Sequence, residues 1–496
     1  MPEGYGRLVE VLDSEFAPKR IIECLKSQVT DAAKAILVEH EYVDKDYRST
    51  FYNFYSKKGR QYRSDCVRLH FFDGTVWYDE KRTDIACVDN KPEHHYFGYV
   101  VLRPTIVATL GRSVLSPDIR LGARGRAIQS VHHVNLLGRR LPVWGFPSMA
   151  QHVDIAVCAH ISCWAILRHY SETFPQHREY LIHDITKLVA PFDPGGLVPS
   201  LGFTVLGAER VFQAAGCFPV LVGKRDTSDA AFYSQLLAYV ESGFPLFVAM
   251  NSQQHAVVIV GYSWRNSAVA PEDSSSHVWE QVDALLTVDD NLLPYETVPL
   301  DSVKNAGGAP AYTATSFDAF VVALPDKIYY PADAIEAWSR RVERWLIQWW
   351  GGKQDAVKLR RYFITTVSEL RKHARENHTH LGNSLVGLMM HLDTAQFVWV
   401  VEFCSVEQWE KGRVAARAIV DATASPRDPV PLWLMHDEEI AFVFDRSTAE
   451  WNFESINLNR SGFGPLPRIE LNLRPVVGHP SGINKNGGTT DSGGNQ

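Results

Sequence analysis

The stretch from Gln254 to Tyr262, QHAVVIVGY, constrains the fold more than any other part of the chain. Its uninterrupted run of apolar, mostly β-branched residues predicts a buried strand. A titratable ring stands at the mouth of that strand, at His255. Such a ring is either a core histidine with its hydrogen bonds satisfied or a base held rigidly against a nucleophile elsewhere in the chain.

Residues 150–325 around this strand alternate between helix and strand patterns. Thr204 is a typical helix N-cap, and Gly216 and Gly243 follow the ends of helical patterns. The order of elements suits an α+β fold whose sheet is mainly antiparallel. The predicted helices cover 158–174, 204–215 and 230–242, and the predicted strands cover 218–223, 244–250, 255–262 and 285–288.

The remaining sequence divides by composition into flanking regions. We expect a mixed α/β region of unknown role over 1–146, the α+β domain over 147–325 and a second α+β domain over 326–480. The tail 481–496 has one apolar residue and is expected to be disordered. Helical spacing predicts helices over 20–39 and 356–376, and β-branched and aromatic residues predict a strand over 96–103.

Composition and cysteine usage exclude several classes of protein. The net charge of −7 and the scattered Lys and Arg residues disfavour a nucleic-acid partner, and no apolar run is long enough to span a membrane. The seven cysteines are odd in number and scattered, and no CxxC pair is present, so we expect neither a disulfide framework nor a structural metal site. The N-terminus lacks a secretory signal pattern, and the expected location is cytoplasmic.

The sequence offers three residue types that a thiol enzyme requires. A thiol becomes a good nucleophile when a helix N-terminus and an imidazolium lower its pKa, and a carboxylate or amide then orients the imidazole. Either Cys158 or Cys163 opens a predicted helix, His255 opens a strand, and Asp289 ends the next one. A Cys-His-Asp site is therefore possible on this spacing.

The strand HAVVIVGY resembles the histidine-strand signature of papain-like cysteine peptidases. The upstream GFPLFV and the Asp that ends the following strand are similar to the bacteriocin-processing peptidase group within that superfamily. The resemblance covers about residues 147–300. It implies a papain-like core, in which an N-terminal helix carrying Cys packs on a mainly antiparallel sheet carrying His and Asp. It implies no cofactor.

Two registers compete for the nucleophile. The sequence SCWA at 162–165 is similar to papain, whose nucleophile precedes Trp-Ala, whereas CAHIS at 158–162 is similar to the bacteriocin-processing group, with Ala in place of Gly. A helical face that continues from Cys158 would place Cys163 inside the helix. The two thiols would point about 140° apart. We favour Cys158, with Cys163 as the alternative.

The other site residues also have alternatives. The family places an oxyanion-hole Gln six residues before the nucleophile; counting from Cys158 gives His152, with Gln151 one residue further. Counting from Cys163 gives Val157, whose side chain cannot donate a hydrogen bond. For the orienting residue we favour Asp289. Asp290 is an alternative, although alternation would turn it away if the strand continued past Asp289, and Asn291 could act as papain's Asn does.

The resemblance implies a thiol hydrolase that cleaves a peptide or isopeptide bond through an acyl-enzyme on Cys158, with a protein or peptide as substrate. The flanking domains would serve recognition or bind a regulatory partner; no nucleic-acid or membrane partner is expected. Acyltransferases and deamidases use the same constellation. A degenerate papain-like fold that acts as a binding or scaffold module is the alternative from another class.

Overall fold

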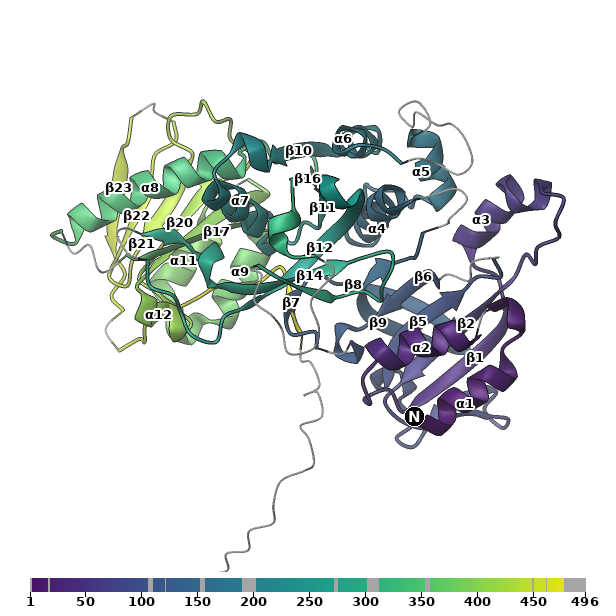
Figure 1. Ribbon diagram of the computed structural model, residues 1–496. Coiled ribbons are helices and arrows are strands. Elements are labelled where there is room, and N and C mark those ends of the chain that lie inside the picture. Colours follow the sequence, from purple (N-terminus) through teal and green to yellow (C-terminus); the bar gives the residue numbers. More distant parts are fainter. Residues whose placement is uncertain are drawn as a thin grey trace, which may run out of the picture.

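The computed structural model describes residues 2–476 except 17, 106–109, 121, 152–156, 190–201, 272–274, 301–311, 353–356, 394, 448–449 and 461. The chain is a mixed α+β structure built mainly on antiparallel sheets. Figure 1 shows three groups of elements that follow one another in sequence, with the second group lying between the first and the third. The predicted tail 481–496 lies outside the described residues.

The N-terminal part forms an antiparallel sheet whose two faces are covered by separate apolar clusters. Helices α1 and α2 lie on one face, and α3 projects beyond the sheet (Figure 1). The helices are α1 (Pro2–Val11), α2 (Pro18–Gln28) and α3 (Lys45–Asn53). The sheet order is β1 (Ala35–Tyr42), β2 (Cys66–Phe72), β5 (Tyr96–Leu102), β6 (Leu110–Leu115), β9 (Arg139–Ser148) and β8 (Ser130–Leu136), and β3 (Val76–Asp79) and β4 (Asp84–Cys87) form a separate hairpin.

The central sheet carries the histidine strand. Its path is β10 (Phe218–Gly223), β16 (Ala319–Leu324), β11 (Leu246–Met250), β12 (His255–Trp264), β14 (Val282–Val288) and β15 (Glu296–Pro299). Two short strands from the flanks, β7 (Gly125–Ala127) and β25 (Arg474–Val476), extend it beside β12. Gly261 is needed there, because a Cβ at this position would lie 2.2 Å from the Arg126 carbonyl oxygen on β7.

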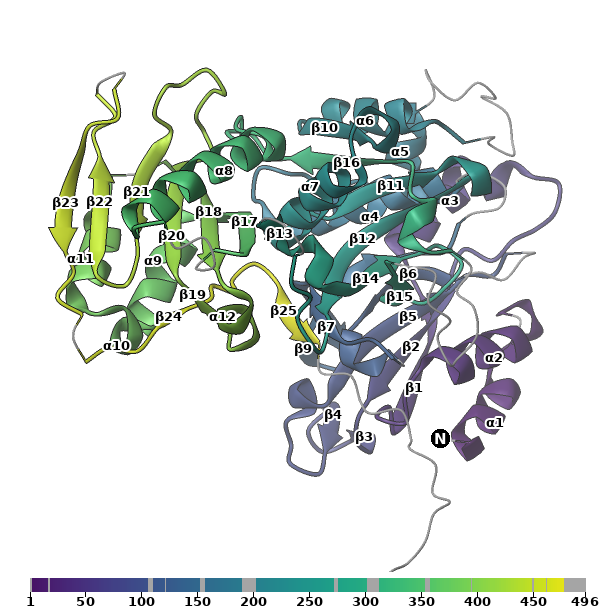
Figure 2. The ribbon, with the colours of Figure 1, turned by 60° about the vertical axis from the view of Figure 1, so that its left-hand side comes forward.

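The C-terminal sheet is antiparallel apart from its first, parallel pair. Figure 2 shows α8 in front of this sheet and α9 and α11 behind it. The strand order is β13 (Ser276–His277), β17 (Leu359–Thr366), β18 (Phe397–Cys404), β20 (Ala416–Asp421), β21 (Leu432–His436), β22 (Ile440–Phe444) and β23 (Phe453–Asn457), and β19 (Arg413–Val414) pairs with β24 (Leu466–Pro467). The remaining helices are α4 (Cys158–Thr173), α5 (Ile182–Val189), α6 (Val205–Ala214), α7 (Asp229–Glu241), α8 (Ala332–Trp349), α9 (Val367–Glu376), α10 (His378–Leu381), α11 (Asn383–His391) and α12 (Val406–Glu410).

The apolar core joins the central and C-terminal parts. One buried cluster runs from Ala123 to Val476 and includes side chains of both sheets. The proposed division at 325/326 therefore runs through a shared core, and the division at 146/147 falls inside β9. The domain limits stay predictions, but the central sheet clearly draws strands from both flanks.

Most elements predicted around the histidine strand are confirmed, and two predicted helices are wrong in part. The helix predicted over 20–39 ends at Gln28, and Ala35–Tyr42 is the strand β1. The helix predicted over 356–376 begins only at Val367, and Leu359–Thr366 is the buried strand β17. In both places the segment pairs with a neighbouring strand, and this pairing overrides the local helical spacing.

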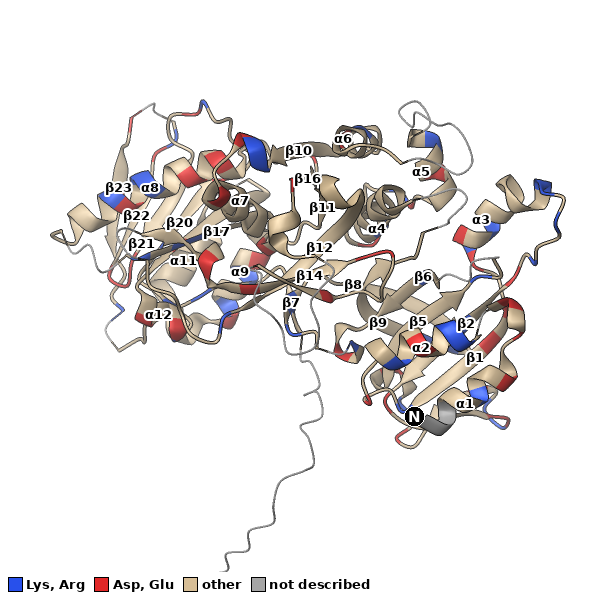
Figure 3. Ribbon diagram, in the orientation of Figure 1, with Lys and Arg blue, Asp and Glu red and all other residues tan. Residues whose placement is uncertain are grey.

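Basic and acidic residues are interspersed over the elements of all three parts (Figure 3). Among the described residues, no helix combines the length and apolarity required to cross a membrane.

Candidate active site

Cys158 is the first residue of α4, so its thiol lies where the helix dipole favours negative charge. Ser162, one turn later, shares the face of Cys158 and donates a hydrogen bond to the Ala256 carbonyl oxygen at 3.4 Å. Ala256 directly follows His255 on β12. The contact turns the face that carries Cys158 towards the start of the histidine strand.

His255 is held rigidly at the start of β12. Gln254 before it has a φ of +48°, a left-handed conformation that an ordinary residue adopts at a cost of roughly 1–2 kcal/mol. This turn brings the chain straight from the end of β11 into β12, where His255 pairs with Met250. The His255 side chain is 17% exposed, which leaves the ring accessible from one side.

Asp289 orients the His255 ring. Strand β14 pairs with β12 so that Val258 faces Val288, and this register brings Asp289 beside His255. The Asp289 Oδ2 atom lies 3.0 Å from His255 Nε2 and accepts a bond from the Tyr312 hydroxyl at 3.1 Å. The Oδ1 atom accepts bonds from the backbone N–H and side-chain amide of Asn291, at 2.9 and 3.1 Å. Hydrogen bonds therefore hold both carboxylate oxygens of Asp289 in place.

The electrostatics of the site favour a charged imidazole. Burial lowers the pKa of His255, but hydrogen bonds with Asp289 and Cys158 and the charges of Asp289 and Asp290 outweigh it and raise the pKa to about 10. Burial likewise opposes ionisation of Asp289, yet its bonds to His255 and Asn291 hold its pKa below the usual value. Because Nε2 faces Asp289, Nδ1 is the ring nitrogen available to the Cys158 thiol.

Asp290, the alternative carboxylate, also lies close to His255. The strand ends at Val288, so alternation does not reach Asp290, and its Oδ1 atom is 3.9 Å from His255 Nε2. Burial and the charge of Asp289 raise the pKa of Asp290 to about 7, although the charge of His255 acts against them. His255, Asp289 and Asp290 together offer three ligand atoms within 4.8 Å, which is a possible set for a metal ion.

The alternative site residues lie elsewhere or cannot be placed. Cys163 is inside α4 and fully buried, as the helical face predicts, and burial raises the pKa of its thiol well above the ordinary value. Gln151 is half-buried, and its backbone carbonyl oxygen accepts a bond from Arg103 at 3.1 Å. His152 lies outside the described residues.

The segment after Asp289 is anchored to the N-terminal part, which sequence reasoning missed. The Leu293 N–H donates to the Gln28 side chain at 2.7 Å. The Tyr295 hydroxyl accepts a bond from the Phe146 N–H at 2.6 Å and donates to the Leu115 carbonyl oxygen at 3.2 Å. The Asp289 loop is thus braced by residues of the N-terminal sheet and helices. The helical spacing near residue 28 gives no local signal of the contact that Gln28 makes.

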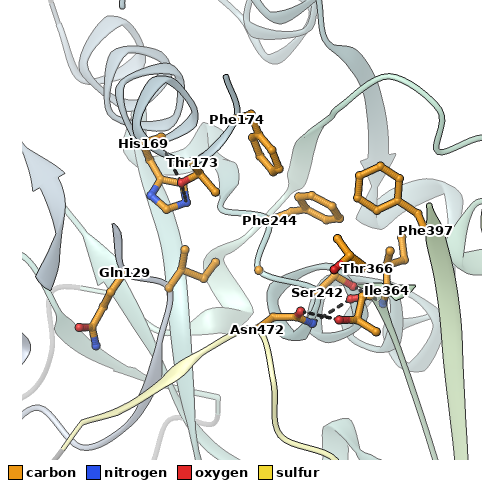
Figure 4. Close-up of a pocket in the computed structure, with 13 residues that line it drawn as sticks. Gln129, His169, Thr173, Phe174, Ser242, Phe244, Ile364, Thr366, Phe397 and Asn472 are labelled. Carbon is orange, nitrogen blue, oxygen red and sulfur yellow. Dashed lines mark hydrogen bonds between the residues drawn. The ribbon is translucent and has the colours of Figure 1, made fainter. Parts of the chain in front are cut away.

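A cavity of about 160 Å³ lies at the other end of α4. Figure 4 shows His169 and Thr173 of this helix on one side and Phe244 and Phe397 on the other. His169 is eleven residues after Cys158, which is about 16 Å along a helix. This cavity is therefore separate from the thiol.

No family model matches the chain, and no significant match was found among curated proteins or solved structures. The geometry of the site is therefore the basis on which a function can be assigned.

Proposed function

We propose that the chain is a papain-like cysteine hydrolase that cleaves a peptide or isopeptide bond. The observation that carries this proposal is the convergence of three elements on one point. Cys158 begins α4, His255 begins the strand against which α4 packs, and Asp289 holds the ring of His255 at 3.0 Å. Nucleophile, base and orienting carboxylate are the minimum set for acyl transfer through a thiol.

The reaction begins with a thiolate–imidazolium pair. The Cys158 thiolate attacks the substrate carbonyl carbon and forms a C–S bond. The pKa of His255 is about 10, so its ring is protonated at neutral pH. The ring gives this proton to the departing amine as the C–N bond breaks. Water then attacks the thioester and passes a proton to His255, and the C–S bond breaks. Asp289 keeps Nε2 engaged and stabilises the imidazolium throughout.

The developing oxyanion lies next to the first turn of α4. The first N–H groups of a helix have no partner within the helix, so the backbone N–H of Cys158 can donate to it. The family pattern adds a side-chain donor at His152 or Gln151. An amine in place of water would turn the same acyl-enzyme into a transferase intermediate.

The seven cysteines of the chain are all free thiols, and this supports the proposal of a reducing, cytoplasmic setting. The flanking parts would then contribute substrate recognition, and the anchoring of the Asp289 loop by Gln28 and Tyr295 supports a direct role for the N-terminal part in the site.

The test is cleavage of a diverse peptide library followed by mass spectrometry. The wild-type chain is expected to cut a defined set of peptides in the presence of EDTA, and Cys158→Ala is expected to cut none of them. Cys163→Ala is the matched control, because it removes the other thiol of the same helix. Cleavage that survives in Cys158→Ala would overturn the proposal. Products joined to an added amine would identify a transferase.

A further inference from the structure

A second group of reactive side chains lies in the N-terminal part, around the segment that connects β4 to β5. The Cys87 thiol, the Asp89 carboxylate and the His95 ring each offer one ligand atom, and these atoms lie within 4.8 Å of one another. The Cys87 Sγ atom is 2.9 Å from Asp89 Oδ1, and His95 Nε2 is 3.1 Å from that same oxygen. Sulfur, nitrogen and oxygen donors thus converge on one point.

These ligands come from the end of β4 and from the segment that connects it to β5. Cys87 ends β4, Asp89 follows it, and His95 directly precedes β5. Asp73, which follows β2, accepts from the other ring nitrogen of His95, Nδ1, at 2.5 Å. A carboxylate on the far ring nitrogen is the usual partner of a metal-binding histidine, since it fixes the tautomer and aims the Nε2 lone pair at the ion. The hydrogen bond between Asp73 and His95 is therefore the feature that a simple turn between two strands would not require.

We propose that Cys87, Asp89 and His95 bind a zinc ion, with Asp73 as the residue that positions His95. Zn²⁺ accepts thiolate, imidazole and carboxylate ligands together, whereas Mg²⁺ and Ca²⁺ prefer oxygen alone. Around a tetrahedral Zn²⁺ with bonds of about 2.0–2.3 Å, ligand atoms lie roughly 3.3–3.5 Å apart. The separations of 2.9 and 3.1 Å need to open only slightly. Asp89 and His95 have exposed fractions of 47% and 30%, so both can move and solvent can supply the fourth ligand.

The ion would fasten the β3–β4 hairpin to the main sheet. This hairpin is a two-stranded sheet of its own, and an isolated hairpin is only marginally stable in water. Cys87 and Asp89 belong to the hairpin and its exit, whereas His95 and Asp73 flank β5 and β2 of the main sheet. The proposed role is structural and does not depend on the thiol chemistry of Cys158.

The experiment is a titration of the reduced, chelator-treated full chain with Zn²⁺ against a chromogenic chelator, repeated with Co²⁺ to detect thiolate-to-metal absorption. We expect one equivalent bound at this site, lost in Cys87→Ala and His95→Ala. Asp73→Asn should weaken binding about 10- to 100-fold. His94→Ala is the matched control, because it removes the adjacent exposed histidine and should bind as the wild type does.

His255→Ala separates this site from the other metal-ligand cluster, which consists of His255, Asp289 and Asp290. Zinc binding that persists in Cys87→Ala and His95→Ala but is lost in His255→Ala would overturn the proposal, as would no binding by the wild type. If Cys87→Ala loses its native circular dichroism, the exposed Asp73→Asn variant decides: unchanged affinity contradicts the site.

Discussion

Alkylation of the Cys158 thiol at pH 6 is expected to slow by roughly 10- to 100-fold when His255 is replaced by Ala. Without its imidazolium, a thiol of ordinary pKa, near 8.5, is thiolate in only about one molecule in 300 at this pH. The proposed ion pair with the imidazolium raises the reactive fraction, and the lower nucleophilicity of a thiolate stabilised in this way offsets part of that gain. The pKa of His255, raised to about 10, keeps the imidazolium in place.

The measurement is the second-order rate constant of iodoacetamide at Cys158, read by peptide mass. His183→Ala is the matched control, because His183 is a half-buried histidine on α5, outside the Cys158–His255–Asp289 contacts. Its rate constant should equal that of the wild type. Circular dichroism spectra of both variants serve to check that they fold. Equal rate constants for wild type and His255→Ala would show that the two side chains do not form a reactive pair.

Glu402→Ala is expected to lower the free energy of unfolding by about 3–5 kcal/mol. Glu402, on β18, is 1% exposed and accepts bonds from Arg361 at 2.8 Å and Arg417 at 2.9 Å. It also accepts the Ile469 N–H at 3.0 Å. Removing this carboxylate leaves Arg417 as a buried cation without its ion-pair partner, while Arg361 retains Glu241 at 2.9 Å.

The measurement is urea unfolding followed by tryptophan fluorescence. Glu407→Ala is the control, because Glu407 on α12 forms an exposed ion pair with Lys411, which follows that helix, and the loss of this pair should change stability by less than about 1 kcal/mol. Equal midpoints for Glu402→Ala and Glu407→Ala would mean that the buried network contributes nothing to stability. Because Arg361 also binds Glu241 on α7, the network links the central and C-terminal parts.

The sequence was most informative where local signals agreed with burial. The helix from Cys158 to Thr173 and the strand from His255 combine an apolar pattern with clear boundaries, and both are confirmed. The strand Leu359–Thr366 was missed because Arg360 and Arg361 fall within it, and charged residues indicate an exposed helix face until their buried partners are known. Only the fold supplies those partners, Glu343 and Glu402 among them.

The candidate site shows the same limit. Cys158, His255 and Asp289 could be chosen because each stands at the boundary of a predicted element. Tyr312 and Gln28 could not, since their contacts to the Asp289 loop join segments that are distant in sequence and carry no motif. Strand alternation would turn Asp290 away only if the strand continued, and β14 ends at Val288, so the sequence could not decide the direction of this side chain.

The central claim is that Cys158 and His255 form a thiolate–imidazolium pair, and the pH dependence of Cys158 alkylation in the wild-type chain tests it most directly. A raised His255 pKa keeps the imidazolium at every pH below about 10, so the cationic partner that the proposed pair requires is present across neutral pH. The account predicts that Cys158 is labelled first among the seven cysteines, with a rate constant nearly flat from pH 6 to pH 9. A rate constant that rises tenfold per pH unit towards about 8.5, or earlier labelling of Cys163, would contradict it.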